Sequence, residues 1–402
     1  MQNRRSPRRT MQPVCEALES RELLSAFHEL SLSSHQKAVA IDTPWNSDPA
    51  PSSILNNLTF VRAVSTVPAV NGDLNPYGVA FVPSGFLPGG NLNPGDILVS
   101  NFNNSGNIQG TGTTIVKIAP DGTQSLFFQG ASLGLDTALA VLKSGFVLVG
   151  NVPSNPSTPV GTPTSTNPQG SIQVLDKFGN LVQTLSVQPL SPPSRVNGPW
   201  DMTVAAGRGS SALVFVSNVL SGTVWRYKLA VRPTTFEPIQ ITSAVLIGSG
   251  FPHGIFPPGL VAGPGGLAYN ANTGTLFVAS QFDNSIYAIY NAGSTSKSHG
   301  TGKLLVHDPT HLRGPIGLTL APNGNLIAAN SDAFNVDPAQ PSELVEYTHR
   351  GAFVAQFSVD PATGGAFGLA ISPPGLSISP NTRTLAAVDD NIAALKEYTF
   401  PT

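Results

Sequence analysis

The stretch NPYGVA (residues 75–80), followed by DILVSN (residues 96–101), decides how this chain folds. The first run is a turn with proline and glycine that leads into a short apolar strand. The second is an unbroken apolar strand that ends in Asn, and such a strand is typically buried on both faces. The run TIVKI (residues 114–118) alternates apolar and polar residues, which indicates a strand with one exposed face.

The same order of strands recurs five more times along the chain. The later openings are LDTALA (135–140), GPWDMT (198–203), PGGLA (264–268), PIGLT (315–319) and AFGLA (366–370). The residues that end the second strands recur every 50 to 67 residues, at Asn101, Asn151, Asn218, Ser280, Asn330 and Asp389. Polar turns then lead to a third and a fourth strand. Four strands in each unit at this spacing predict an all-β fold, a six-bladed β-propeller.

The sixth unit contains only three clear strands, and the run LTFVRAV (residues 58–64) supplies a fourth. An N-terminal strand that completes the last blade would close the ring and remove an exposed sheet edge. We therefore predict the propeller over residues 58–402. A basic leader (residues 1–30) and a linker rich in Ser, Pro, Asn and Ala (residues 31–57) precede it.

The composition limits the classes of partner. Charged residues make up 11% of the 402 residues, against about 25% in typical soluble domains. The formal net charge is −2 and no basic patch follows the first 25 residues, so we expect no nucleic-acid partner. No apolar run approaches the ~18 residues of a transmembrane helix. The only cysteine, Cys15, lies in the leader, and we expect a monomer.

The leader combines four arginines within its first ten residues with the stretch LESRELLSA (residues 18–26). That stretch resembles the LEPR-XLL segment near the N-terminus of many exported proteins of planctomycete-type bacteria, although Ser20 stands where the motif usually has Pro. The resemblance implies export, to the cell surface or the extracellular space. The alternative is an ordinary amphipathic helix with a basic arm.

The repeated units resemble NHL repeats and the six-bladed propellers of the regucalcin and gluconolactonase group. The matching features are the Pro-x-Gly-(Leu/Val)-Ala opening, the Asn or Asp at the end of the second strand, and the turn after the third strand. The resemblance covers residues 58–400 loosely, and it specifies the blade and not the activity. The regucalcin and gluconolactonase group holds a metal with a Glu, an Asn and an Asp near the axis. No Glu occupies a first-strand start here.

One face of the predicted propeller is a candidate binding face, because three loops between second and third strands are long: 102–113, 152–170 and 331–342. Neutral insertion is the alternative. The residues at the strand ends should ring this face. Their side-chain oxygens either bind a sugar, a lactone or a cation, or accept backbone N–H groups and set the next turn. These residues are Asn101, Asn151, Asn218, Asn330 and Asp389.

Asp136 and Asp201 stand at the start of their first strands, where other units have Gly or apolar residues. Both are expected near the axial channel as metal ligands or a general base, or else as solvated carboxylates or strand caps. Ca²⁺ or another divalent cation is the cofactor that such ligands suit. His307 and His311 are four residues apart, but Pro309 between them predicts a loop and not a metal-binding helix.

The sequence contains no nucleophile elbow, phosphate-binding loop, EF-hand loop or paired CxxC motif. The leading hypothesis is an exported, non-catalytic propeller that binds a small molecule, glycan or protein through its long-loop face. The alternative is a metal-dependent hydrolase or lactonase with its site at the axial channel. A structural cell-surface module is a third possibility that the sequence does not separate from the first.

Overall fold

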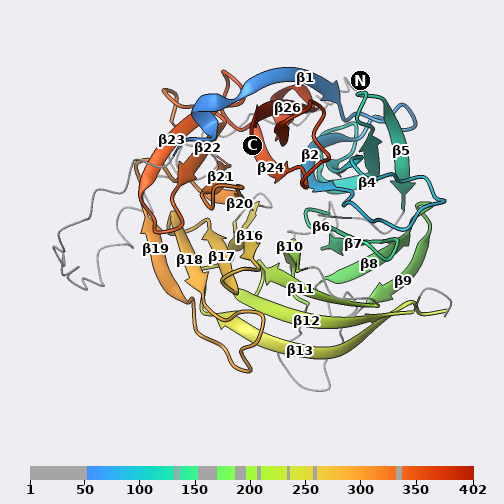
Figure 1. Cartoon of the computed structure of the whole chain (residues 1–402), viewed down its shortest axis with the longest axis horizontal. Coiled ribbons are helices and arrows are strands. Elements are labelled where there is room, and N and C mark those ends of the chain that lie inside the picture. The colour runs from blue at the N-terminus through green and yellow to red at the C-terminus, as the bar shows by residue number, and fades with distance from the viewer. Residues whose placement is uncertain are drawn as a thin grey trace, which may run out of the picture. The chain divides into compact units, whose positions relative to one another are not determined.

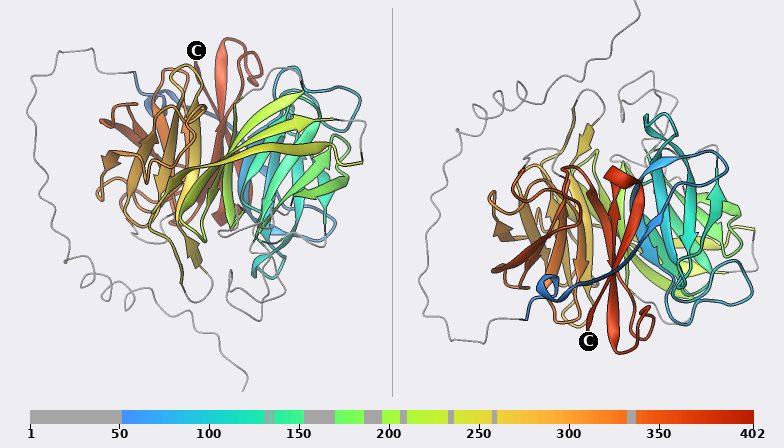
Figure 2. Two further views of the ribbon diagram at one scale, coloured as in Figure 1. Left: turned by 90° about the horizontal axis from the view of Figure 1, so that it is seen from below. Right: turned by 90° about the horizontal axis from the view of Figure 1, so that it is seen from above.

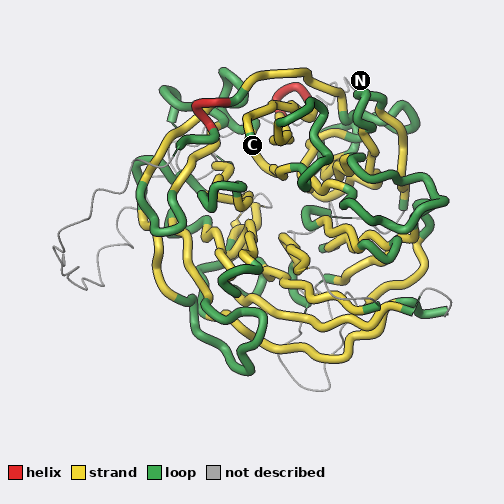
Figure 3. The backbone as a smooth tube through the Cα atoms, in the orientation of Figure 1, coloured by secondary structure: helices red, strands yellow, loops and turns green. Residues whose placement is uncertain are grey.

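The computed structural model divides the chain into two compact units, Met1–Ala50 and Pro51–Thr402. All residues that the structure describes lie in the second unit. They are residues 52–130, 134, 136–152, 170–185, 196–205, 210–232, 236–256, 260–331 and 337–402. Strands dominate this unit, and the two short 3₁₀ turns η1 (Leu55–Asn57) and η2 (Asp390–Ile392) are its helical elements among the described residues (Figure 3). None of the described helices could cross a membrane.

Six four-stranded antiparallel sheets are arranged around one axis, as Figure 1 shows. The prediction of a six-bladed propeller is therefore confirmed. Blade 1 holds β2 (Leu74–Phe81), β3 (Ile97–Asn103), β4 (Gln109–Ile118) and β5 (Gln124–Gln129). Blade 2 holds β6 (Leu139–Leu142), β7 (Phe146–Asn151), β8 (Ser171–Asp176) and β9 (Leu181–Leu185). Blade 3 holds β10 (Pro199–Ala205), β11 (Ser211–Asn218), β12 (Thr223–Val231) and β13 (Ile239–Ser249).

The remaining blades follow the same order. Blade 4 holds β16 (Pro264–Asn270), β17 (Thr275–Ser280), β18 (Ser285–Ile289) and β19 (Lys303–His307). Blade 5 holds β20 (Pro315–Leu320), β21 (Leu326–Asn330), β22 (Glu343–Tyr347) and β23 (Phe353–Ser358). Blade 6 holds β24 (Ala366–Ile371), β25 (Thr382–Asp389), β26 (Ala394–Pro401) and, at its outer edge, β1 (Thr59–Ser65).

The core consists of apolar layers between neighbouring blades. The second strands β3, β7, β17 and β21 are buried along their whole length, whereas the outer strand β9 has no buried residue. One layer joins Phe215 of blade 3 to Val278 of blade 4, and another joins Leu148 of blade 2 to Val214 of blade 3. Strands packed on both sides read as unbroken apolar runs, which is the signal that the sequence carries.

The N-terminal strand closes the ring, as predicted. β1 pairs antiparallel with β26, with Thr59 opposite Thr399. Arg62 of β1 forms an ion pair of 2.9 Å with the buried Glu397 of β26. Before β1, the backbone N–H of Leu55 donates to Glu346 of blade 5 at 3.0 Å. The segment from Leu55 through β1 is thus bound to both blade 5 and blade 6.

Two features differ from the predicted arrangement. The loop expected over residues 102–113 is shorter, because β3 and β4 extend into it and leave residues 104–108 as the turn. Asn104 accepts the N–H groups of Gly106 and Ile108, and Asn107 has a φ of 56°, so a tight turn replaces a long loop. An unpredicted hairpin of β14 (Gly254–Phe256) and β15 (Leu260–Ala262) projects between blades 3 and 4 (Figure 2).

Candidate binding site at the axial end of the long-loop face

The long-loop face is the end of the propeller that carries the β3–β4, β7–β8 and β21–β22 connections and the entries to the first strands. Most of the second connection (residues 153–169) and part of the third (residues 332–336) lie outside the described residues. As predicted, the second strands end on this face. The residues at those ends, however, have different environments.

Two of the strand-end residues are used by the fold itself. Asn218 accepts the backbone N–H of Asn197 at 2.9 Å. Asn330 accepts the backbone N–H of Arg313 at 3.0 Å and donates through Nδ2 to the carbonyl of His311 at 2.7 Å. In blades 3 and 5 the side chain therefore fixes the chain that enters the same blade, which is the capping role that Asn performs at strand ends.

The other strand-end residues are buried as well. Asn101 donates through Nδ2 to the carbonyl of Thr66 at 2.9 Å, while its Oδ1 accepts no hydrogen bond from the residues that the structure describes. Asn151 lies buried at the end of β7. Asp389 forms an ion pair of 2.6 Å with Lys396. Burial raises the pKa of Asp389 above its usual range, although the hydrogen bond and charge of Lys396 act in the opposite direction.

Asp201 bridges blades 3 and 4 beside the axis. Its Oδ2 accepts the backbone N–H of Leu267 in β16 at 2.6 Å, and its Oδ1 accepts the N–H of Met202 at 2.7 Å. At the same place in the repeat, blades 1, 4, 5 and 6 have glycine, because neighbouring first strands approach closely. A Cβ on Gly317 would lie 2.5 Å from the carbonyl oxygen of Phe367. Burial raises the pKa of Asp201 to about 7, partly opposed by the two N–H groups.

Asp136 has no such partners. Its side chain is 0% exposed, and neither carboxylate oxygen accepts a hydrogen bond among the described residues. Only its backbone is tied, since its carbonyl accepts the hydroxyl of Ser100. Burial raises the pKa of Asp136 well above its usual range; the residue's own backbone N–H acts in the opposite direction, and the charge of Asp73 acts in the same direction as burial. A buried carboxylate without a partner needs a proton or a positive group close by.

The two aspartates belong to separate environments. Asp201 is held by blades 3 and 4, whereas Asp136 is electrostatically coupled to Asp73 ahead of blade 1. Within the described ranges, no three acidic, His or Cys side chains form a group that could hold a metal ion. A cation at Asp136 would therefore take most of its ligands from amide, hydroxyl or backbone oxygens or from water.

The axial channel is closed at the long-loop face by an aromatic cluster that sequence reasoning missed. Tyr77 stacks on Phe102 and on Phe367, with ring centroids 5.4 and 5.1 Å apart. The indole Nε1 of Trp200 donates to the Tyr77 hydroxyl at 3.0 Å. One position of the repeated opening varies between blades, and in four blades it holds a large apolar or aromatic residue: Tyr77, Trp200, Ile316 and Phe367. The cluster could have been predicted from this position.

Beside this cluster lies a narrow cavity of about 40 Å³, lined by Tyr77, Thr137, Trp200, Asp201, Ile316 and other first-strand residues. This volume has room for a few water molecules, since one water needs roughly 10–15 Å³ by this measure. It is too small for a sugar ring. A larger ligand would have to bind outside this cavity.

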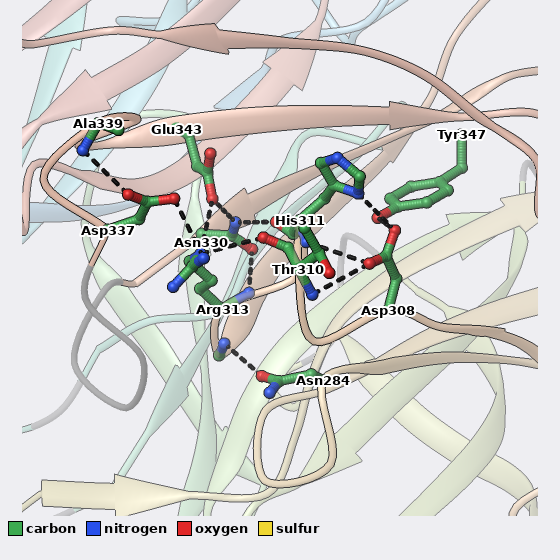
Figure 4. Close-up of polar contacts among 11 residues, drawn as sticks. Asn284, Asp308, Thr310, His311, Arg313, Asn330, Asp337, Ala339, Glu343 and Tyr347 are labelled. Carbon is green, nitrogen blue, oxygen red and sulfur yellow. Dashed lines mark hydrogen bonds and ion pairs between the residues drawn. The ribbon is translucent and has the colours of Figure 1, made fainter. Parts of the chain in front are cut away.

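His311 belongs to a polar network that joins blades 4 and 5 (Figure 4). Asp308 accepts hydrogen bonds from the His311 ring at 2.7 Å and from the Tyr347 hydroxyl at 2.9 Å. Burial tends to raise the pKa of Asp308, but these hydrogen bonds outweigh it and hold the pKa below its usual range. Arg313 forms an ion pair of 3.1 Å with Asp337 in the same network.

His307, the other histidine of the pair, lies at the end of β19, and its Nδ1 lies 2.9 Å from the backbone carbonyl of Asp283. Each of the two rings has its own partner, and the pair forms no metal site among the described residues. The predicted loop between the blades is confirmed for residues 308–314.

Comparisons with known proteins show similarity in structure alone. No protein-family model matches the chain, and no curated protein matches it significantly. A gluconolactonase from Xanthomonas campestris is 12% identical, covers 88% of this chain and 99% of its own, and has a TM-score of 0.49. The calcium-binding protein regucalcin from Agrobacterium tumefaciens is also 12% identical, with 85% and 96% covered and a TM-score of 0.47.

Virginiamycin B lyase from Staphylococcus aureus is 12% identical to the chain, with 84% of this chain and 98% of the lyase covered and a TM-score of 0.45. At such identities the similarity concerns the fold, and the function must be argued from the residues of the site.

Proposed function

We propose that this protein is a ligand-binding β-propeller whose site lies at the axial end of the long-loop face. The proposal rests on the location of the buried polar atoms that have no hydrogen-bond partner among the described residues. In the described part of the chain they gather on this face, at second-strand ends, in the turns that follow them and at first-strand entries. They belong to Asn75, Asn101, Asn103, Asp136, Asn197, Ser280, Gln281, Asp283 and Ser331.

The reason is energetic. A buried polar group without a partner costs about 1–3 kcal/mol, so folded proteins retain few of them unless water, an ion or a ligand completes them. Most of these atoms are oxygens. The ligand should therefore bring hydrogen-bond donors or positive charge. A small molecule, a glycan or a segment of another protein fits this description.

The second candidate function is a metal-dependent hydrolase or lactonase. Asp136 favours it, because a fully buried carboxylate without a partner among the described residues suits a divalent cation such as Ca²⁺. Asp136 would hold the cation together with neighbouring amide, hydroxyl or backbone oxygens. When bound, the cation would polarise a carbonyl group or a water molecule. No first strand of this chain starts with a Glu, and in this respect the chain still differs from the regucalcin and gluconolactonase pattern.

One experiment separates the two candidates. The metal content and the calcium-dependent thermal unfolding of the full chain are measured for wild type, Asp136→Ala and Asp201→Ala. A stoichiometric metal that Asp136→Ala loses and Asp201→Ala retains supports the hydrolase and calls for a screen of lactones and esters. No metal and no calcium-dependent shift in any of the three rejects the hydrolase and leaves the binding propeller.

We also propose that residues 1–30 direct export, so that the propeller works at the cell surface or outside the cell. The proposal is supported by the basic run and the LEPR-XLL-like stretch at residues 18–26, which lie outside the described residues. A reporter fused behind residues 1–57 should leave the cytoplasm of a planctomycete-type host. Retention of the reporter inside the cell would contradict export.

A further inference from the structure

In each blade one residue directly follows the Asn, Ser or Asp that ends the repeated second-strand pattern on the long-loop face. We call these six residues the axial ring: Phe102, Val152, Val219, Gln281, Ser331 and Asp390. A shared backbone contact shows their equivalence. In blades 3 to 6 the N–H of this residue donates to the carbonyl of the glycine at the first-strand entry. The distances are 2.8 Å for Val219, 3.3 Å for Gln281, 3.2 Å for Ser331 and 2.9 Å for Asp390.

In blades 1 to 4 the side chains at this position pack in the axial cluster or beside a first strand. Phe102 stacks on Tyr77, and Val152 and Val219 pack in the same axial cluster as Trp200. In blade 4 the opening carries Gly265 where other blades have Tyr77 or Trp200, and the Gln281 amide lies beside it. A Cβ on Gly265 would be 3.2 Å from Nε2 of Gln281. Blade 4 thus has an amide in place of an aromatic ring.

The axial ring has an apolar half and a polar half. Blades 1 to 3 contribute Phe102, Val152 and Val219, which complete the cluster. Blades 4 to 6 contribute Gln281, 1% exposed, Ser331, 4% exposed, and Asp390. Both polar atoms of the Gln281 amide and the Ser331 hydroxyl have no hydrogen-bond partner among the residues described. A buried amide that makes none of its hydrogen bonds within the described chain requires a partner from elsewhere.

The polar half carries negative charge. Burial and the neighbouring charge of Asp389 raise the pKa of Asp390 to about 6, so its carboxylate remains mostly ionised at neutral pH. The nearest lysine in the blade, Lys396, is committed to Asp389 at 2.6 Å and to the carbonyl of Val359 at 2.6 Å. No ion pair to Asp390 occurs in the part of the chain that the structure describes. A cationic group would complete this half.

We propose that the polar half of the axial ring binds a 1,2-amino alcohol. Three consecutive blades offer three acceptors, Gln281 Oε1, the Ser331 hydroxyl and the Asp390 carboxylate, and a primary ammonium group carries three donors. The hydroxyl beside the ammonium group accepts a bond from Gln281 Nε2. The inference rests on the proposed ligand-binding function and names the chemical class of the ligand.

Ethanolamine is the smallest probe of this chemistry. Thermal unfolding of the full chain is followed with ethanolamine, with choline, which keeps the charge but has no N–H donor, and with ethylene glycol, which has the hydroxyl but no charge. We expect ethanolamine to raise the melting temperature by a few degrees and the two controls to leave it unchanged. No shift with ethanolamine, or an equal shift with choline, would overturn the proposal.

Gln281→Met removes both amide groups at similar volume, and Gln129→Met makes the same change at the exposed end of β5. Gln281→Met should lose the ethanolamine shift, whereas Gln129→Met should keep it. A shift that survives in Gln281→Met rejects the assignment to this residue. Metal or another ligand bound without any ethanolamine shift rejects the amino alcohol alone. No binding of any kind rejects the proposed function as well.

Discussion

The two halves of the axial ring have equivalent backbone positions but side chains of opposite polarity. In blades 1 to 3, Phe102, Val152 and Val219 pack against Tyr77 and Trp200 and leave nothing to be completed. In blades 4 to 6, Gln281 and Ser331 are equally buried but make no side-chain hydrogen bond among the described residues. The apolar half is satisfied by folding, and the polar half is satisfied only by something that binds.

The first strands repeat this contrast with two carboxylates. Asp201 uses both oxygens to bind backbone N–H groups of blades 3 and 4. Asp136 is fully buried and has no partner for either oxygen in the described chain. The two halves of the axial ring differ in the same way as Asp201 and Asp136. In each comparison, one member stabilises the propeller through its own contacts, and the other requires a ligand to complete its hydrogen bonds.

The largest effect is expected in the apolar half. Trp200→Ala removes a buried ring and its hydrogen bond to Tyr77, and should lower the free energy of unfolding by about 3–5 kcal/mol. Urea unfolding of the full chain measures it. Trp200→Phe keeps most of the packing and should lose less. A loss in Trp200→Ala below about 1 kcal/mol would show that the aromatic cluster does not organise the axis.

Asp201 should make stability depend on pH. Its pKa is 3.8 in the unfolded chain and about 7 in the folded protein, so the folded protein keeps a proton that the unfolded chain has released between these values. The stabilising contribution is present below pH 3.8 and is lost as the pH rises toward 7, by at most about 4 kcal/mol.

Asp201→Asn should flatten the pH dependence between these limits, as thermal unfolding at a series of pH values would show. Asp176→Asn is the matched control, because Asp176 ends the third strand of blade 2 and is no part of a first strand. If wild type and Asp201→Asn show the same slope, the carboxyl group of Asp201 is not the group that titrates.

A substitution of Asp136 sharpens the comparison of the two carboxylates, because its effect on the free energy of unfolding should change sign when a cation is bound. Without a cation, Asp136→Asn removes a charge that burial disfavours and should raise the free energy of unfolding by about 1–3 kcal/mol at neutral pH. With a bound cation, the same variant should be less stable than wild type. Unfolding with and without a chelator decides the sign, and destabilisation in the presence of chelator would contradict an unpartnered carboxylate.

The smallest effect is expected for Gln281→Met without ligand. The variant replaces a buried amide without partners by an apolar chain of similar volume, and its free energy of unfolding should stay within about 1 kcal/mol of wild type or rise. Denaturant unfolding measures the change. A loss as large as that of Trp200→Ala would mean that the Gln281 amide already has a structural partner.

The fold could be predicted from the sequence because burial on both faces leaves an unbroken apolar run, as in residues 96–101 and 213–218. The closing strand could be predicted because the last blade was one strand short. The candidate site was predicted only in part. Asn218 and Asp201 were visible as polar residues at repeated positions, but their partners Asn197 and Leu267 come from chain entries and a neighbouring blade.

Gln281 was missed because its importance lies in what surrounds it. The sequence shows a polar residue after the second strand of blade 4, as it does in blades 5 and 6. It does not show that the amide packs beside Gly265, or that no described neighbour bonds to it. Such absences depend on contacts between blades, which a single sequence does not encode in any local pattern.

The central claim is that the buried polar atoms of the long-loop face are completed by a ligand. A high-resolution crystal structure of the full chain, purified without chelator and soaked with ethanolamine, tests it most directly. The account predicts a group other than water within hydrogen-bonding distance of Gln281, or a cation at Asp136. Ordered water alone at both positions, or protein partners for both side chains, would contradict it.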